Sequence, residues 1–181
     1  MKYYSPVHLD NLKTIQEKVF EYFPKEELRK REALFYIPDN LNVFLSIPEL
    51  KAELDKLIWT PYVFSIGFYI IAPTNGTHIH LDSNTFNHSF NIPILNCENT
   101  FVNFFKTDKE PKKEVYKLYD TLVNYYRFDP IDCEVADQLE MVTPHVINVQ
   151  EPHNVVNKNT KPRITLLIRL RNDIDLSHLF Q

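Results

Sequence analysis

The segment from Thr77 to Asp82 reads Thr-His-Ile-His-Leu-Asp, so imidazole and carboxylate groups stand at every second position. Alternate residues of a β-strand project to the same face, which places His78, His80 and Asp82 together and the aliphatic residues between them on the other face. Such groups are costly to bury unless they are paired, and a divalent metal is a common partner. The segment predicts a metal site, with an exposed edge strand as the alternative.

A second polar element follows about seventy residues later. His153 stands in the sequence Glu-Pro-His-Asn-Val, and Arg163 opens Arg-Ile-Thr-Leu-Leu-Ile-Arg. On a strand, Arg163, Thr165 and Arg169 share one face, whereas the intervening residues on the other face are aliphatic. An arginine among so many aliphatic residues is rarely left without an anionic partner. We therefore expect this strand to bind an anion.

Two histidines and one carboxylate on one side of a metal leave three adjacent coordination positions free. Non-haem Fe(II) oxygenases use such positions for a chelating acid and O₂. An arginine beyond the metal can hold the far carboxylate of that acid through two parallel hydrogen bonds. Two rivals stay open, because His145 can replace His153 as the distal ligand and Arg169 can replace Arg163 as the anion-binding residue.

In order and spacing, these residues resemble the Fe(II)/2-oxoglutarate-dependent dioxygenase superfamily. The matching positions are His80-x-Asp82, the distal His153, Arg163 and Thr165. More narrowly, His-Ile-His-Leu-Asp, Asn-Ile-Pro-Ile, Pro-His-Asn-Val and the arginine strand are similar to small prolyl-hydroxylase-like oxygenases of phage and environmental microbes. The resemblance covers about residues 60–171. Arg-x-Thr departs from the commoner Arg-x-Ser but keeps a hydroxyl.

The resemblance implies a hydroxylase with three cofactors or cosubstrates: Fe(II), 2-oxoglutarate and O₂. Iron is then held by His80, Asp82 and His153, and the tail of 2-oxoglutarate by Arg163 and Thr165. The substrate is unidentified, and a peptidyl or amino-acid side chain is favoured by analogy.

Three further residues have two interpretations each. Asn91 on the next strand either binds the cosubstrate or is satisfied by backbone groups, and Tyr69 either reaches the cosubstrate or belongs to the core. His78 either supports the ligand or substrate or merely lines the cavity.

The remaining pattern predicts helices first and strands afterwards. Apolar residues at helical spacing indicate one helix from about Leu9 to Phe23 and another from about Ser46 to Trp59. The second helix begins with Ser46-Ile47-Pro48-Glu49, which matches a capping box with proline in the first turn. Strands are expected at about 62–72, 77–82, 88–95, 100–106, 134–142, 145–149, 153–156 and 162–170.

These elements favour an α+β, mainly β fold, namely a double-stranded β-helix of the jelly-roll, cupin-like kind with N-terminal helices packed on one sheet. The length of 181 residues suits a single domain over residues 1–181. Residues 1–60 form a helical support in this scheme and residues 61–171 form the core. The stretch near 107–132 has no clean period and is expected to be an irregular insertion.

Composition excludes several functions. Only two glycines occur, so glycine-rich loops that bind dinucleotides or phosphates are ruled out. A net charge of −4 and a pI near 6.0 disfavour nucleic acid as a partner. The two cysteines are far apart and no signal-like or membrane-spanning apolar run occurs, so we expect a cytoplasmic protein without a membrane partner.

Two other functions compete with the oxygenase. The His-x-His pattern also resembles metal-dependent hydrolases of the TatD kind, but these have a barrel of about 250 residues, and too few residues follow the motif here. The third hypothesis is a non-catalytic cupin-like module that binds a metal or ligand.

Overall fold

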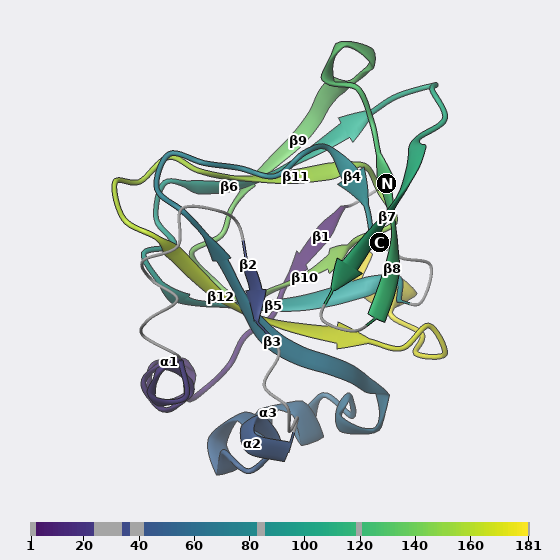
Figure 1. Cartoon of the computed structure of the whole chain (residues 1–181). Helices are drawn as coiled ribbons and strands as arrows, with labels where there is room; N and C mark the ends of the chain where they lie inside the picture. Colours follow the sequence, from purple (N-terminus) through teal and green to yellow (C-terminus); the bar gives the residue numbers. More distant parts are fainter. Residues whose placement is uncertain (1–2, 24–33, 37–41, 83–85, 119–120, 181) are drawn as a thin grey trace.

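The computed structural model describes residues 3–23, 34–36, 42–82, 86–118 and 121–180. Two six-stranded antiparallel sheets face each other across a barrel-like interior (Figure 1). Sheet A has the strand order β1 (Tyr4–Pro6), β10 (His145–Asn148), β5 (His88–Leu95), β12 (Arg163–Leu170), β3 (Val63–Ile71) and β2 (Leu34–Tyr36). Sheet B has the order β7 (Lys112–Leu118), β8 (Thr121–Arg127), β4 (His80–Leu81), β11 (His153–Asn157), β6 (Thr100–Lys106) and β9 (Glu134–Glu140).

The path of the chain through these sheets defines the fold. Strands β3, β5, β10 and β12 are adjacent in sheet A, and strands β4, β6, β9 and β11 are adjacent in sheet B. The chain crosses repeatedly from one sheet to the other, and the eight strands form two antiparallel four-stranded layers. This is a double-stranded β-helix, as the sequence predicts. The TatD-type interpretation is wrong, because it requires a barrel of parallel strands.

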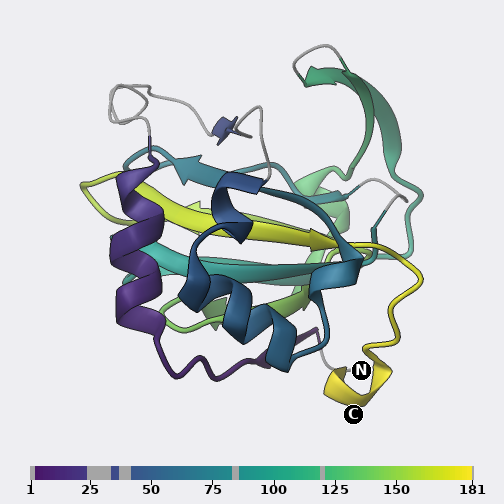
Figure 2. The ribbon, with the colours of Figure 1, turned by 90° about the horizontal axis from the view of Figure 1, so that it is seen from below.

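The helices cover the outer face of sheet A. They are α1 (Leu12–Glu21), α2 (Asn42–Leu45) and α3 (Pro48–Lys56), and Figure 2 shows them lying against that sheet. Helix α1 buries Ile15 and Val19, and α3 buries Leu50 and Leu54. None of the helices in the described ranges has the length and apolar character needed to cross a bilayer. Short 3₁₀ turns occupy Thr60–Tyr62, Pro130–Asp132 and Ser177–Phe180.

The apolar residues form separate clusters on the two faces of sheet A. One cluster joins the helices to the outward residues of β12, namely Ile164, Leu166, Ile168 and Leu170. A second cluster fills the interior between the sheets and consists of Ile71, Phe86, Val102, Phe104, Leu139, Met141, Ile147, Val149 and Val155. Most of the apolar packing of the helices therefore lies outside the barrel, which leaves room for polar residues inside it.

The structure corrects three local expectations. Helix α3 begins after Ile47 without a side-chain cap, because the Ser46 hydroxyl donates to the Val43 carbonyl oxygen at 2.7 Å instead. Strand β4 contains only two residues, so His78 precedes it and does not share its inner face. The helical support in residues 1–60 includes the short strands β1 and β2, while residues 24–33 and 37–41 lie outside the described ranges.

The insertion near 107–132 is not irregular. Residues 112–118 and 121–127 form the hairpin β7–β8, which pairs with β4 and extends sheet B; residues 119–120 lie outside the described ranges. The hairpin lies at the margin of the sheet, and Val115 on β7 is 58% exposed. The described side chains of β7, residues 112–115, are exposed or only partly buried, and such a strand carries no clean alternation of apolar and polar residues.

Phe68 tests the contribution of the cluster between the helices and sheet A. This residue of β3 is fully buried, and its ring meets those of Phe23 and Phe44 at centroid distances of 5.0 and 5.3 Å. Truncation to alanine should lower the free energy of unfolding by about 3–5 kcal/mol in denaturant titrations. The matched variant Phe64→Ala, on the same strand but 47% exposed, should lose about 1 kcal/mol or less. Equal losses would contradict this packing.

Candidate metal and anion site

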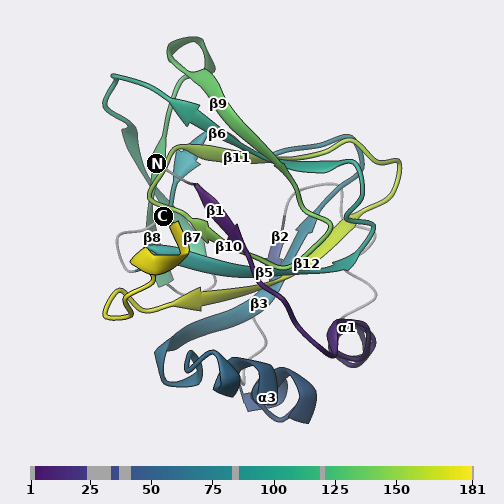
Figure 3. The ribbon, with the colours of Figure 1, turned by 180° about the vertical axis from the view of Figure 1, so that it is seen from behind.

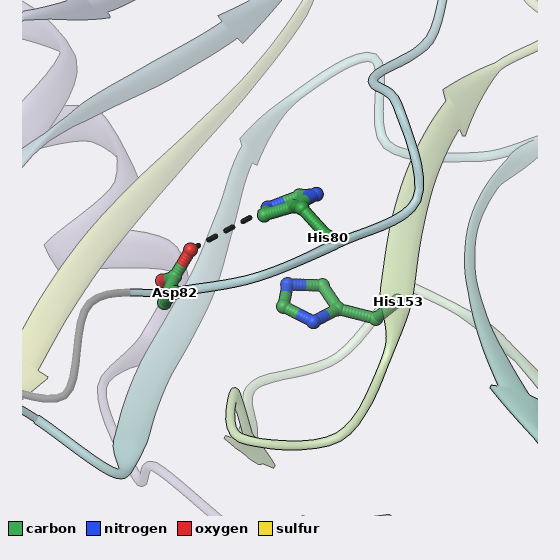
Figure 4. A group of neighbouring side chains, drawn as sticks. All are labelled: His80, Asp82 and His153. Atoms are coloured by element: carbon green, nitrogen blue, oxygen red, sulfur yellow. Dashed lines mark ion pairs between the residues drawn. The ribbon is translucent and has the colours of Figure 1, made fainter. Parts of the chain in front are cut away.

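Three potential ligands meet at the inner face of sheet B. His80 on β4 and His153 on β11 are cross-strand partners, and Asp82 follows directly after β4. One ligand atom from each residue lies within 4.8 Å of the others. The distance from His80 Nε2 to Asp82 Oδ1 is 3.4 Å, and the two imidazole centroids are 4.4 Å apart (Figure 4). The structure thus brings together two imidazoles and one carboxylate from distant segments.

The backbone sets the tautomer of both histidines. His80 Nδ1 lies 2.8 Å from the His78 carbonyl oxygen, and His153 Nδ1 lies 2.9 Å from the Glu151 carbonyl oxygen. A carbonyl oxygen only accepts, so each Nδ1 must carry the proton and donate it. Each Nε2 then holds a lone pair in the neutral imidazole. This is the form in which histidine binds a metal.

The charges of the cluster also suit a cation. Burial opposes ionisation of Asp82, but a hydrogen bond from His80 in the form protonated on Nε2, together with the charge of Arg169, holds the pKa of Asp82 well below its usual range. Burial and the charge of His80 lower the pKa of His153 to about 4. At neutral pH Asp82 is therefore ionised and His153 is neutral, which are the protonation states that metal binding requires.

The segment before His80 is attached to β11 by close backbone contacts. Thr77 N donates to the Val155 carbonyl oxygen, and Val155 N donates to the Thr77 hydroxyl oxygen, both at 2.9 Å. At Gly76 a β-carbon would lie 2.9 Å from the Val155 carbonyl oxygen, too close for any residue but glycine without a shift of the backbone. These contacts hold the two histidine-bearing segments in register.

The two competing histidines lie elsewhere. His78 is exposed and is outside the cluster; its carbonyl oxygen, rather than its ring, contacts His80. His145 is buried on β10 in the opposite sheet, where its Nδ1 lies 2.8 Å from the Thr143 carbonyl oxygen. Burial lowers the pKa of His145. The histidine that meets His80 and Asp82 is therefore His153.

Arg163 is the largest side chain that is fully buried, at 1% exposure. Its cross-strand partner Ile71 belongs to the interior cluster, so the guanidinium projects into the barrel. The Nε and Nη1 atoms have no hydrogen-bond partner, and no carboxylate within the described residues pairs with Arg163. Burial lowers the pKa of Arg163, and the thiol of Cys97 is its side-chain hydrogen-bonding neighbour. A cation in this state lacks the anion that normally compensates burial.

Thr165, Tyr69 and Asn91 stand on the same inner face of sheet A. The fully buried Thr165 hydroxyl has no partner in the described part of the chain, and its cross-strand neighbour is Tyr69. Burial raises the pKa of Tyr69 to about 12; the charges of Arg163 and Asp82 act on it in opposite directions, and Thr77 is its side-chain hydrogen-bonding neighbour. Asn91 donates to the Ser89 carbonyl and hydroxyl oxygens at 3.0 and 3.1 Å. The amide nitrogen of Asn91 is thus satisfied within its own strand.

Arg169 differs from Arg163 in its surroundings. Its guanidinium lies over the ring of Phe86, 4.7 Å from the centroid, and it interacts electrostatically with Asp82. This second arginine therefore has an acidic neighbour, Asp82, among the three potential metal ligands. Of these two arginines, Arg163 is the one whose charge is not compensated by a carboxylate of the described residues.

Some residues at the site were not predicted from the sequence. The ring of Tyr125 stacks on His80 with centroids 4.7 Å apart, but Tyr125 belongs to the hairpin whose sequence has no readable period. Cys97 adjoins Arg163 from a turn after β5 and has no motif around it. Sequence spacing carried no signal for either contact.

No protein-family model and no curated protein matches the chain. Among solved structures, a Pseudomonas putida prolyl-4-hydroxylase is 14% identical, with 94% of this chain and 93% of that chain covered and a TM-score of 0.47. The Staphylococcus aureus capsular polysaccharide assembling protein CapF is 16% identical over 67% of this chain and 28% of its own, with a TM-score of 0.33. Bacillus subtilis oxalate decarboxylase is 12% identical over 80% of this chain and 27% of its own, with a TM-score of 0.37. This chain therefore matches little more than a quarter of the last two proteins.

The pKa of His153 predicts how stability depends on pH in the metal-free protein. The pKa is about 4 in the folded state and 6.5 when the ring is exposed, so the unfolded chain binds the extra proton first as the pH falls. Stability is fully present above pH 6.5 and should fall by on the order of 3 kcal/mol between pH 6.5 and 4. Denaturant titrations in EDTA should show a flatter profile for His153→Gln. The control His178→Gln, at an exposed site, should keep the wild-type slope. An unchanged slope in His153→Gln would refute this assignment.

Proposed function

We propose that the protein is an Fe(II)- and 2-oxoglutarate-dependent oxygenase that hydroxylates a peptidyl or amino-acid side chain, with residues 1–181 acting as one domain. The observation that carries this proposal is the buried Arg163, which lacks an anionic partner among the described residues. Its guanidinium enters the same barrel interior onto which the His80, Asp82 and His153 cluster opens. A metal ligand set beside an uncompensated cation favours an anionic chelator that spans the two.

The ligand set suits ferrous iron. Two imidazoles and one carboxylate form the facial arrangement of non-haem Fe(II) oxygenases, and they leave adjacent positions for a chelating acid and for O₂. The chemistry that iron supplies when bound is O₂ activation coupled to oxidative decarboxylation of 2-oxoglutarate, with succinate, CO₂ and hydroxylated product. The protein contributes the position and charge of the groups around it.

The inner face of sheet A supplies the remaining contacts. Arg163 donates two hydrogen bonds to the distal carboxylate of 2-oxoglutarate, and the Thr165 hydroxyl donates a third. Tyr69, the cross-strand partner of Thr165, has a pKa of about 12, so its hydroxyl stays protonated and is a further donor for the cosubstrate. Asn91 lies one strand further along this wall. The apolar residues Val102 and Val155 face this wall from sheet B and exclude water, which strengthens the charged contacts.

Uncoupled turnover tests the enzymatic proposal. Anaerobic protein supplied with Fe(II) and 2-oxoglutarate should form succinate once air is admitted, and His80→Ala should abolish that formation because a ligand is lost. The matched variant His78→Ala removes an exposed histidine two residues earlier and should retain turnover. Succinate formation in His80→Ala at the wild-type rate would refute the assignment. Binding of iron and 2-oxoglutarate without turnover, even with candidate substrates, would favour the non-catalytic cupin-like module.

Arg163→Met tests the cosubstrate site. Loss of the buried charge should remove about 2 kcal/mol or more of binding free energy, which weakens 2-oxoglutarate binding about 30-fold or more. The affinity is measured by anaerobic calorimetry with Mn(II) in place of iron. Mn(II) affinity should not change. The free protein should be at least as stable as wild type, because an uncompensated buried cation is removed. Arg171→Met, at a half-exposed arginine just beyond β12, should bind 2-oxoglutarate normally. Unchanged affinity in Arg163→Met would direct attention to Arg169.

A further inference from the structure

A row of cross-strand partners crosses sheet B and includes the two histidines of the candidate metal site. It runs from His80 to His153, then to Phe104 on β6 and to Asp137 on β9. Cross-strand partners project to the same face, and Phe104 is fully buried in the interior cluster. Asp137 therefore belongs to the inner face, two strand spacings or about 10 Å from His153. It is half-buried and has no cationic partner in the described ranges, and its Oδ1 accepts only the Gln138 amide at 2.8 Å.

Aromatic rings from the opposite sheet reach this row. Strand β1 forms one edge of sheet A and β9 forms one edge of sheet B (Figure 3). Tyr3 and Tyr4 stack on Phe104 with ring centroids 4.9 and 5.7 Å apart. Burial, and after it the charge of Asp137, raises the pKa of Tyr4. The cross-strand neighbour of Asp137 is thus an aromatic ring, Phe104, on which two further rings stack.

The polar groups of His145 and Asp137 are mainly hydrogen-bond acceptors. His145 is 6% exposed, and its ring lies edge-on to Tyr4 at a centroid distance of 5.7 Å. Because His145 Nδ1 donates to the Thr143 carbonyl oxygen, the Nε2 atom keeps a lone pair. The Asp137 carboxylate accepts as well, and the tyrosine ring faces attract cations. Arg169 is engaged with Asp82 and Phe86. Arg127, the cross-strand partner of His80, lies 4.0 Å from the carboxylate of Glu114.

We propose that Tyr4, Asp137 and His145 form a subsite for a cationic group of the substrate, an ammonium or guanidinium such as a lysine or arginine side chain carries. This inference rests on the proposed function and names the substrate class of the same site. The carboxylate compensates the charge, His145 Nε2 accepts an N–H, and the aromatic rings contact the alkyl stem and the cation. With about 10 Å between Asp137 and His153, the reacting carbon lies several bonds from the cation.

Binding to the full chain loaded with Mn(II) and 2-oxoglutarate tests the subsite. The probes are Nα-acetyl-lysine amide and its neutral analogue Nα-acetyl-norleucine amide, titrated under nitrogen and followed by ligand-observed NMR. Wild-type protein should bind the lysine probe at least about ten-fold more tightly, corresponding to one charge-assisted contact. Asp137→Asn should reduce that preference to about two-fold or less. The control Asp132→Asn, at an exposed carboxylate in a neighbouring turn, should keep it.

Equal affinity for the two probes, failure of both to bind, or an unchanged preference in Asp137→Asn would overturn the subsite. Binding of 2-oxoglutarate to wild-type protein is measured in the same samples. Its absence would count against the proposed oxygenase, whereas its presence without a preference for the cationic probe would count against the subsite alone. The two failures are therefore distinguishable.

Discussion

The uncompensated charge of Arg163 is the constraint on which the rest of the site depends. A guanidinium with 1% exposure and without a carboxylate partner among the described residues destabilises the free protein. An anionic ligand removes that cost, so part of the binding free energy comes from relief of a penalty already present in the fold. The other arginine of the strand, Arg169, has Asp82 as its acidic neighbour. The charge of Arg163 is thus uncompensated inside the barrel, whereas the charge of Arg169 is balanced by Asp82 among the potential metal ligands.

The double-stranded β-helix tolerates this charge because it separates two apolar clusters. The outward residues of β12 pack against α1 and α3, whereas its inward residues include Arg163, Thr165 and Arg169. Packing of the helices stabilises the sheet from outside, so the inner face of the same sheet is free to carry polar groups. Sheet B supplies the opposite, mostly apolar wall together with His80 and His153. One wall therefore offers hydrogen bonds, and the other carries the potential metal ligands and excludes water.

Alternation within strands made much of this arrangement predictable from the sequence. The pattern from Arg163 to Leu170 correctly separated inward from outward residues, and the strand order confirmed the fold class. The meeting of His80, Asp82 and His153 was expected from the family resemblance, although their role as iron ligands stays a prediction. Alternation failed at His78, because β4 is too short to include it. It also gave no signal for the β7–β8 hairpin, where the described side chains of β7 are mostly exposed, or for the contact of Tyr3 with Phe104, which joins distant segments.

A crystal structure with Mn(II) and N-oxalylglycine, an inert analogue of 2-oxoglutarate, tests directly whether the three ligands and Arg163 form one binding site. We expect Mn(II) bound by His80, Asp82 and His153, with the analogue chelating the metal and its distal carboxylate in two hydrogen bonds to Arg163. A metal bound away from His80, Asp82 and His153, or an analogue bound with Arg163 still unpaired, would contradict the proposed site.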